Sequence, residues 1–74
     1  MKLVPVPADK VIRVLEKAGF VKIRQKGSHV ILKRGEKTTV VPVHKNEDIR
    51  PALLLKILSD TEITRDEFLE SLGK

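Results

Sequence analysis

Apolar residues near the start of the chain recur at the spacing that places them on one face of a helix. This pattern predicts an amphipathic helix over residues 8–18, with Pro7 suited to its entry and Gly19 to a left-handed stop. The apolar face would consist of Val11, Ile12, Leu15 and Ala18.

The middle of the chain alternates between apolar and polar side chains, which is the period of a half-buried strand. Three strands are predicted, over residues 20–25, 28–33 and 38–43. The breaks between them, at 26–27 and 34–37, are short and favour antiparallel pairing of consecutive strands.

A helical pattern returns after the polar stretch 45–48, which is predicted to be a loop. Pro51 suits the first turn of a second helix, whose apolar density indicates burial. Thr64 and Glu67 have the spacing of a capping box, which predicts a short third helix ended by Gly73.

Residues 1–74 are expected to form a single small domain. Its fold class is predicted as α+β, in the order α-β-β-β-α-α, with a three-stranded antiparallel sheet and helices on one face. The chain has no cysteine, so its stability must come from aliphatic packing and not from disulfides or thiolate metal sites.

Strand alternation also predicts which side chains lie on the face of the sheet that the helices leave open. The residues expected to point outward are Lys22, Arg24, His29, Ile31, Lys33, Thr38, Val40 and, by continuation, His44. Those expected to point into the core are Val21, Ile23, Val30, Leu32, Thr39, Val41 and Val43. Both histidines and three cations would then share one exposed face, unless a one-residue bulge reverses an assignment.

Positive charge is concentrated in the first half of the chain. Residues 1–34 contain nine Lys and Arg against two Asp and Glu, whereas residues 35–74 contain six against eight. This asymmetry favours a polyanion-binding surface, with ordinary surface solubility as the alternative. No apolar run approaches the ~20 residues of a membrane span, and the expected location is the cytoplasm.

Candidate chemistry centres on the pentad Lys26-Gly27-Ser28-His29-Val30. Imidazole exchanges protons near neutral pH, and among cations it suits chemistry on a phosphodiester. RNA supplies its own nucleophile, the 2′-hydroxyl, so such a site needs proton transfer and positive charge but no metal or other cofactor. The two histidines lack the companion ligands of a zinc site.

Each candidate residue also has a structural interpretation. His29 could be a strand residue hydrogen-bonded to its neighbours, and His44 could cap the end of a strand. Gly27 could serve only a tight turn, and the hydroxyl of Ser28 could bond to the backbone.

Several segments together resemble the HicA-type mRNA interferase toxins over roughly residues 8–70. They are Ala18-Gly19-Phe20, Arg24-Gln25-Lys26-Gly27-Ser28-His29, Val40-Val41-Pro42-Val43-His44, Ile49-Arg50-Pro51 and Lys56-Ile57-Leu58. The resemblance implies a fold like that of double-stranded-RNA-binding domains and metal-independent cleavage of messenger RNA. It also implies a HicB-type antitoxin as partner and maps the catalytic histidine of the family onto His29.

Two positions depart from the family pattern. Many members have a second histidine where this chain has Val30, and many have Gly-Thr where it has Ala52-Leu53. Strand alternation would place Val30 on the face opposite His29, so the catalytic assignment is unaffected, whereas the second departure concerns the start of the second helix.

The leading functional hypothesis is therefore a toxin that cleaves messenger RNA, with His29 as general acid or base. The predicted RNA-binding residues are Lys22, Arg24, Lys26, Gly27, Ser28, Lys33 and His44. One alternative is a non-catalytic double-stranded-RNA- or DNA-binding module that uses the same basic face. Another is a small adaptor whose sheet edge or helix pairs with another protein, which is compatible with the toxin hypothesis because an acidic antitoxin could neutralise the same face.

Overall fold

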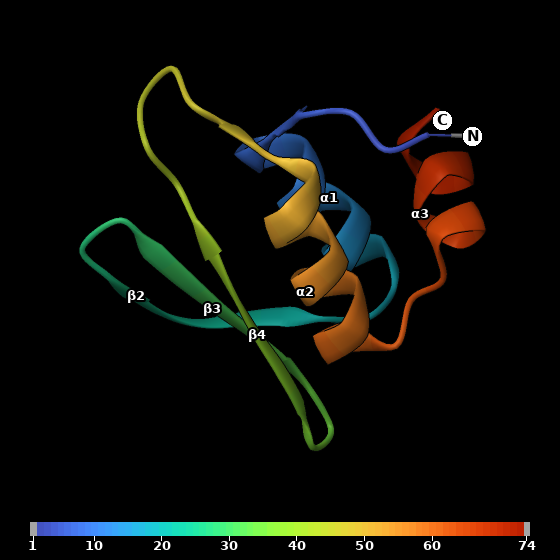
Figure 1. Cartoon of the computed structure of the whole chain (residues 1–74). Coiled ribbons are helices and arrows are strands. Elements are labelled where there is room, and N and C mark those ends of the chain that lie inside the picture. Colours follow the sequence, from blue (N-terminus) through green and yellow to red (C-terminus); the bar gives the residue numbers. More distant parts are fainter. Residues whose placement is uncertain (1, 74) are drawn as a thin grey trace.

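Three helices and a three-stranded antiparallel sheet form the described part of the chain, residues 2–73, in this computed structural model (Figure 1). The elements are β1 (Val6–Pro7), α1 (Ala8–Lys17), β2 (Val21–Lys26), β3 (His29–Arg34), β4 (Lys37–Pro42), β5 (Asp48–Ile49), α2 (Pro51–Thr61) and α3 (Arg65–Leu72). The predicted order and fold class are confirmed. The short ribbon in which β1 pairs with β5 was not predicted, because two-residue strands leave no periodic pattern.

Local sequence determines where the helices begin and end. Gly19, with a φ of 99°, follows α1 in a conformation that residues with a side chain rarely adopt. Pro51 occupies the first turn of α2, where its missing N–H costs no hydrogen bond. The predicted capping box of α3 is present, with the N–H of Thr64 donating to Glu67 Oε1 over 2.9 Å and the N–H of Glu67 donating to Thr64 Oγ1 over 3.1 Å.

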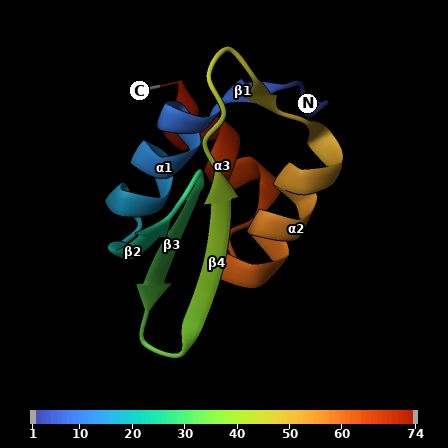
Figure 2. The same ribbon diagram turned by 90° about the vertical axis from the view of Figure 1, so that its left-hand side faces the viewer.

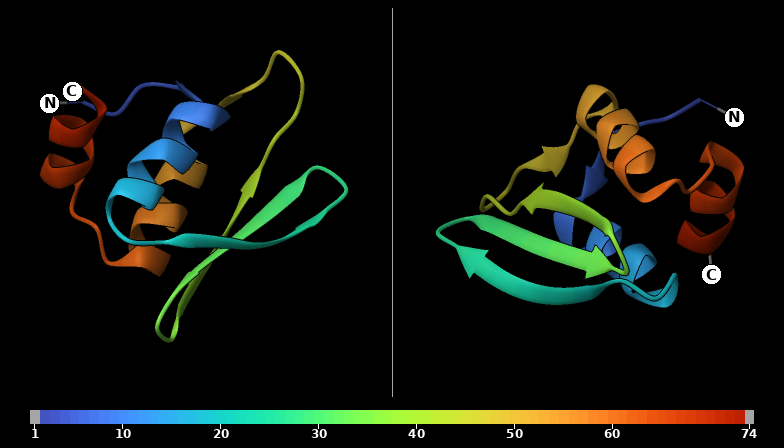
Figure 3. Two further views of the ribbon diagram at one scale, coloured as in Figure 1. Left: turned by 180° about the vertical axis from the view of Figure 1, so that it is seen from behind. Right: turned by 90° about the horizontal axis from the view of Figure 1, so that it is seen from below.

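The helices lie on one side of the sheet, whose strand order is β2-β3-β4 (Figures 1 and 2). Helices α1 and α2 both pack against β4, and α3 packs against α1 farther from the sheet. In the views of the described residues, no helix covers the other face of the three strands (Figure 3). This uncovered surface is called the open face.

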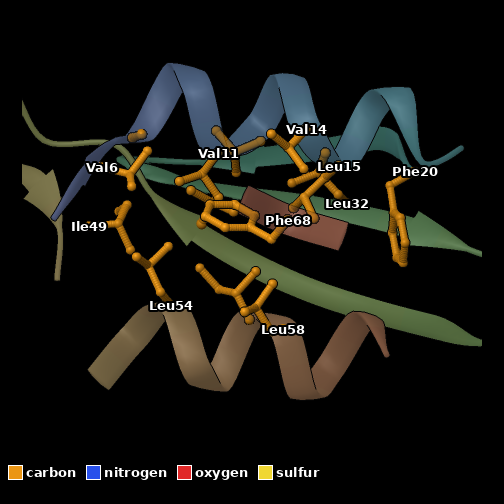
Figure 4. Packing of buried hydrophobic residues seen from close by; sticks show 14 of the residues in the cluster. Val6, Val11, Val14, Leu15, Phe20, Leu32, Ile49, Leu54, Leu58 and Phe68 are labelled. Atoms are coloured by element: carbon orange, nitrogen blue, oxygen red, sulfur yellow. The ribbon is translucent and has the colours of Figure 1, made fainter. Parts of the chain in front are cut away.

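The core lies between the sheet and the three helices, and Phe68 of α3 reaches its centre (Figure 4). Fully buried side chains from each layer surround it, namely Val11, Leu15, Leu32, Val41, Leu54 and Ile57. Thr39 is also buried, and its hydroxyl donates to Asp60 Oδ2 over 3.1 Å, which connects β4 to α2. The three helices and strands β3 and β4 therefore all contribute to the core, whereas β2 does not.

Strand alternation is confirmed in β3 and β4 but fails in β2. Val30, Leu32, Thr39 and Val41 are buried as predicted. Val21 and Ile23, predicted to point into the core, are 62% and 55% exposed. Val43, also predicted inward, is exposed because it lies beyond the end of β4.

A bulge and an edge position explain the error in β2. Its pairing with β3 shifts between Lys22 and Arg24, so Ile23 is an extra residue and the alternation reverses there. In addition, β2 is an edge strand on the side of the sheet away from β4 and α2, and all six of its residues are exposed. The alternation of polar and apolar residues in β2 therefore does not indicate which side chains are buried.

Candidate active site on the open face

The register of the sheet defines the side chains of the open face, because residues directly opposite one another in antiparallel strands project to the same side. Lys26, His29 and Pro42 form one row across the three strands, nearest the β2–β3 turn. The next two rows are Arg24, Ile31 and Val40, and then Val21, Lys33 and Thr38. The face is thus apolar at its centre, with cations on two of its three strands.

The two histidines meet at one end of this face. The ring centroids of His29 and His44 lie 6.4 Å apart, with the ring planes close to perpendicular. His29 opens β3, whereas His44 lies two residues past β4, where the chain leaves the sheet beside the β2–β3 hairpin (Figure 3). Both side chains are exposed, and within residues 2–73 neither imidazole has a hydrogen bond to a protein group.

These observations bear on the structural interpretations of both histidines. A strand histidine with a purely structural role is expected to hydrogen-bond its neighbours, and one that caps a strand is expected to bond free backbone groups. In the described residues neither ring does so, and both remain open to solvent. The two imidazoles are therefore available to a ligand.

Gly27 forms the corner next to His29. It has a φ of 61°, and a Cβ at this position would meet no atom within 4 Å, so the requirement for glycine is conformational and not steric. Its carbonyl oxygen accepts a hydrogen bond from Gln25 Nε2 over 3.2 Å. Ser28 is half-buried, and its carbonyl oxygen accepts from the N–H of Val43 over 2.6 Å.

The register separates the predicted cations into two groups. Arg24, Lys26 and Lys33 lie on the open face. Lys22 pairs with Leu32, a core residue, so the expectation that it shares a face with Arg24 is wrong. Its Nζ instead donates to Gln25 Oε1 over 2.9 Å, on the helix-facing side of the exposed edge strand. The bulge after Lys22 is the physical cause.

A hollow of about 280 Å³ adjoins His44 and was not predicted. Its walls include Arg50 and the carboxylates of Glu47 and Asp48, together with Leu53 of α2. These residues belong to the segment that the β1–β5 ribbon holds beside α2. The ribbon has no pattern in the sequence, so the position of Arg50 beside His44 could not be inferred from it.

Taken together, the arrangement suits proton transfer on a phosphate-containing ligand. It offers two solvent-exposed imidazoles, neighbouring cations and a glycine corner on an uncovered surface. Among residues 2–73, no three His, Cys, Asp or Glu side chains are grouped to hold a metal ion. No helix in this part of the chain has the length and apolar character needed to cross a membrane.

A comparison with protein families matches this chain to one family model, described as the HicA toxin of bacterial toxin-antitoxin, over residues 8–63. The match includes α1, all three strands of the sheet and α2, and with them both histidines and the open-face cations. A search of curated proteins found no match.

Proposed function

Because the chain belongs to the HicA toxin family, and is thus the toxin of a toxin–antitoxin system, we propose that it is an endoribonuclease that cleaves messenger RNA. Cleavage would proceed without a metal ion and would inhibit translation and growth. Such a toxin acts in the cytoplasm, where its substrate is found, and serves a stress response.

The observation that supports this function best is the exposure of the His29 imidazole among open-face cations. Lys26 lies directly opposite His29 in the ladder, and Arg24 and Lys33 lie on the same face. Positive charge would bind the RNA backbone and stabilise the additional negative charge of the phosphorane. The Gly27-Ser28 corner would position the scissile phosphate beside His29.

The reaction transfers the phosphoryl group within the RNA. The 2′-oxygen forms a bond to phosphorus while the bond from phosphorus to the 5′-oxygen breaks. One group accepts the proton of the 2′-hydroxyl, and one donates a proton to the departing 5′-oxygen. The products are a 2′,3′-cyclic phosphate and a 5′-hydroxyl. His29 would take one of these two proton-transfer roles.

The open face would also be the surface that the antitoxin neutralises. A HicB-type partner with an acidic surface would complement Arg24, Lys26 and Lys33 and cover His29. Such a partner would inhibit cleavage by competing directly with RNA.

Expression in a bacterial host tests this function. Induction of the wild-type chain should arrest growth and translation, and sequencing of RNA ends should find new 5′-hydroxyl termini within messages. Induction of His29→Ala at equal protein level should do neither. Purified wild-type protein that binds varied RNAs without cutting any of them would overturn the proposal and leave the alternative, a non-catalytic binding module.

A further inference from the structure

We propose that His44 is the second catalytic residue, acting with His29 on the same phosphodiester. One of the two imidazoles would accept the proton of the 2′-hydroxyl, and the other would protonate the 5′-oxygen. This inference rests on the proposed function, since it assigns the second proton-transfer role in that reaction.

The sheet register places His44 where such a partner is needed. His29 pairs with Pro42, and the bond from Val43 N–H to Ser28 oxygen continues the ladder by one residue. His44 follows directly, and its ring lies 6.4 Å from that of His29, so both rings project to the same side at this end of the sheet. A Cβ at Gly27 would meet no atom within 4 Å, so even a side chain there would begin outside contact with either ring.

The separation of the rings fits a phosphate held between them. Each proton transfer needs a ring nitrogen within about 3 Å of its oxygen. The rings must therefore be closer than two such hydrogen bonds plus the width of a phosphate. A centroid separation of 6.4 Å, in an edge-to-face arrangement, meets this condition.

The hollow beside His44 gives the substrate room on its other side. Its volume of about 280 Å³ suits one nucleotide unit of an RNA strand that continues into solvent. Arg50 in its wall could bind an adjacent phosphate, and the carboxylates of Glu47 and Asp48 could accept hydrogen bonds from a base edge. A strand passing from this hollow to Lys26 would cross both imidazoles.

Several charged groups lie near the histidine pair. Lys26 lies opposite His29, with Arg24 in the neighbouring row. Lys45 follows His44, and the hollow adds the carboxylates of Glu47 and Asp48 and the guanidinium of Arg50. Lys26, an ammonium next to His29, is the main rival of His44 as the second proton-transfer group.

The decisive probe is an RNA with sulfur in place of the 5′-oxygen at a linkage that the wild-type protein cuts. A thiolate departs without a proton, so this substrate no longer needs the general acid but still needs the general base. Cleavage rates of the oxygen and sulfur linkages would be measured for the wild type, His29→Ala and His44→Ala. Lys10→Ala, a change at an exposed position of α1, serves as the surface control, and circular dichroism verifies folding.

On the oxygen linkage, both histidine variants should lose about 10²–10⁴-fold in rate, while Lys10→Ala stays within a few-fold. On the sulfur linkage, only one of the two histidine variants should regain a cleavage rate close to that of the wild type. The histidine replaced in that variant is the general acid. The bell-shaped pH profile of the wild type should lose one limb in His44→Ala.

Three results would overturn the role of His44. The first is a normal rate of cleavage of the oxygen linkage by His44→Ala. The other two are a restored rate on the sulfur linkage in both histidine variants, or in neither of them. If Lys26→Ala recovers on sulfur and His44→Ala does not, the second role belongs to Lys26. A wild-type protein that cuts no RNA would instead refute the proposed function itself, so the two failures are distinguishable.

Discussion

The backbone N–H of Val43 donates to the carbonyl oxygen of Ser28 over 2.6 Å, one residue past the last regular pair of β3 and β4. His29 follows Ser28, and His44 follows Val43. This backbone hydrogen bond therefore joins the residues that precede the two histidines and extends the β3–β4 ladder to them. The sheet thus fixes the backbone next to both imidazoles.

Gly27 and Gly35 provide a matched pair for testing the turn beside the histidines. Both have a φ of 61°, and a Cβ at either position would meet no atom within 4 Å. Alanine should therefore destabilise the fold equally at both, by about 1–2 kcal/mol from the left-handed conformation alone. Only Gly27→Ala should also slow RNA cleavage, because Gly27 belongs to the corner that would position the scissile phosphate, whereas Gly35 lies in the β3–β4 turn at the other end of the sheet.

Denaturant unfolding and cleavage rates of the two glycine variants measure these effects separately. Equal losses of cleavage in Gly27→Ala and Gly35→Ala would mean that the change acts through stability alone. That outcome would remove the Gly27 corner from the candidate site.

Lys26 and Lys22 test which side of β2 binds RNA. They are the same residue type on one strand, yet Lys26 pairs with His29 on the open face and Lys22 pairs with Leu32 on the other. RNA affinity would be measured against salt concentration in a His29→Ala background, which prevents cleavage. Lys26→Ala should weaken binding and reduce the salt slope by about one. An equal or larger effect of Lys22→Ala would contradict the assignment of faces.

The exposure of β2 predicts unequal costs for the same substitution in two strands. Val21 is 62% exposed, whereas Val41 is fully buried. Val21→Ala should change the free energy of unfolding by less than about 0.5 kcal/mol. Val41→Ala removes two buried methyl groups and should cost about 2 kcal/mol. Thermal or urea unfolding measures both changes. A similar loss of stability in the two variants would mean that Val21 points into the core.

The capping box of α3 predicts a pH dependence of stability. The N–H and, to a lesser extent, the hydroxyl of Thr64 lower the pKa of the Glu67 carboxyl from its ordinary value of 4.5. The folded state thus binds this proton more weakly than the unfolded state does. The stability it contributes is present above pH 4.5 and is lost as the pH falls through the lowered pKa.

Melting temperatures measured across this acid range would check the contribution of Glu67. Glu67→Gln can still accept the hydrogen bond but does not titrate, so its stability should fall less steeply on acidification than that of the wild type. Thr64→Ala should lower the melting temperature at neutral pH as well, because it removes the acceptor for the N–H of Glu67. Identical acid profiles of the wild type and Glu67→Gln would contradict the lowered pKa.

Much of the fold was predictable because it depends on local chemistry. The left-handed Gly19, the first-turn Pro51 and the capping residues Thr64 and Glu67 act within a few residues of their own positions. Alternation identified the faces of β3 and β4 because, in each strand, the residues of one face are buried in the core. It failed in β2, where Ile23 interrupts the register and no burial constrains the pattern.

The site was only partly predictable for a related reason. His29 and Lys33 follow from the alternation of one strand, so their shared face could be inferred from the sequence. Arg50 and the hollow beside His44 depend on the pairing of Val6 with Ile49, residues distant in the chain. The sequence pattern of a two-residue strand is too short to report such a contact.

The most direct test of the central claim is cleavage of an RNA that lacks one oxygen atom. In the presence of a chelator, the wild-type protein should cut an RNA to leave 2′,3′-cyclic phosphate ends, and His29→Ala should leave it intact. A matched RNA with 2′-deoxynucleotides at the mapped sites should resist the wild-type protein at those sites. Cleavage of the deoxy-substituted linkages at the normal rate, or undiminished cutting by His29→Ala, would contradict the account.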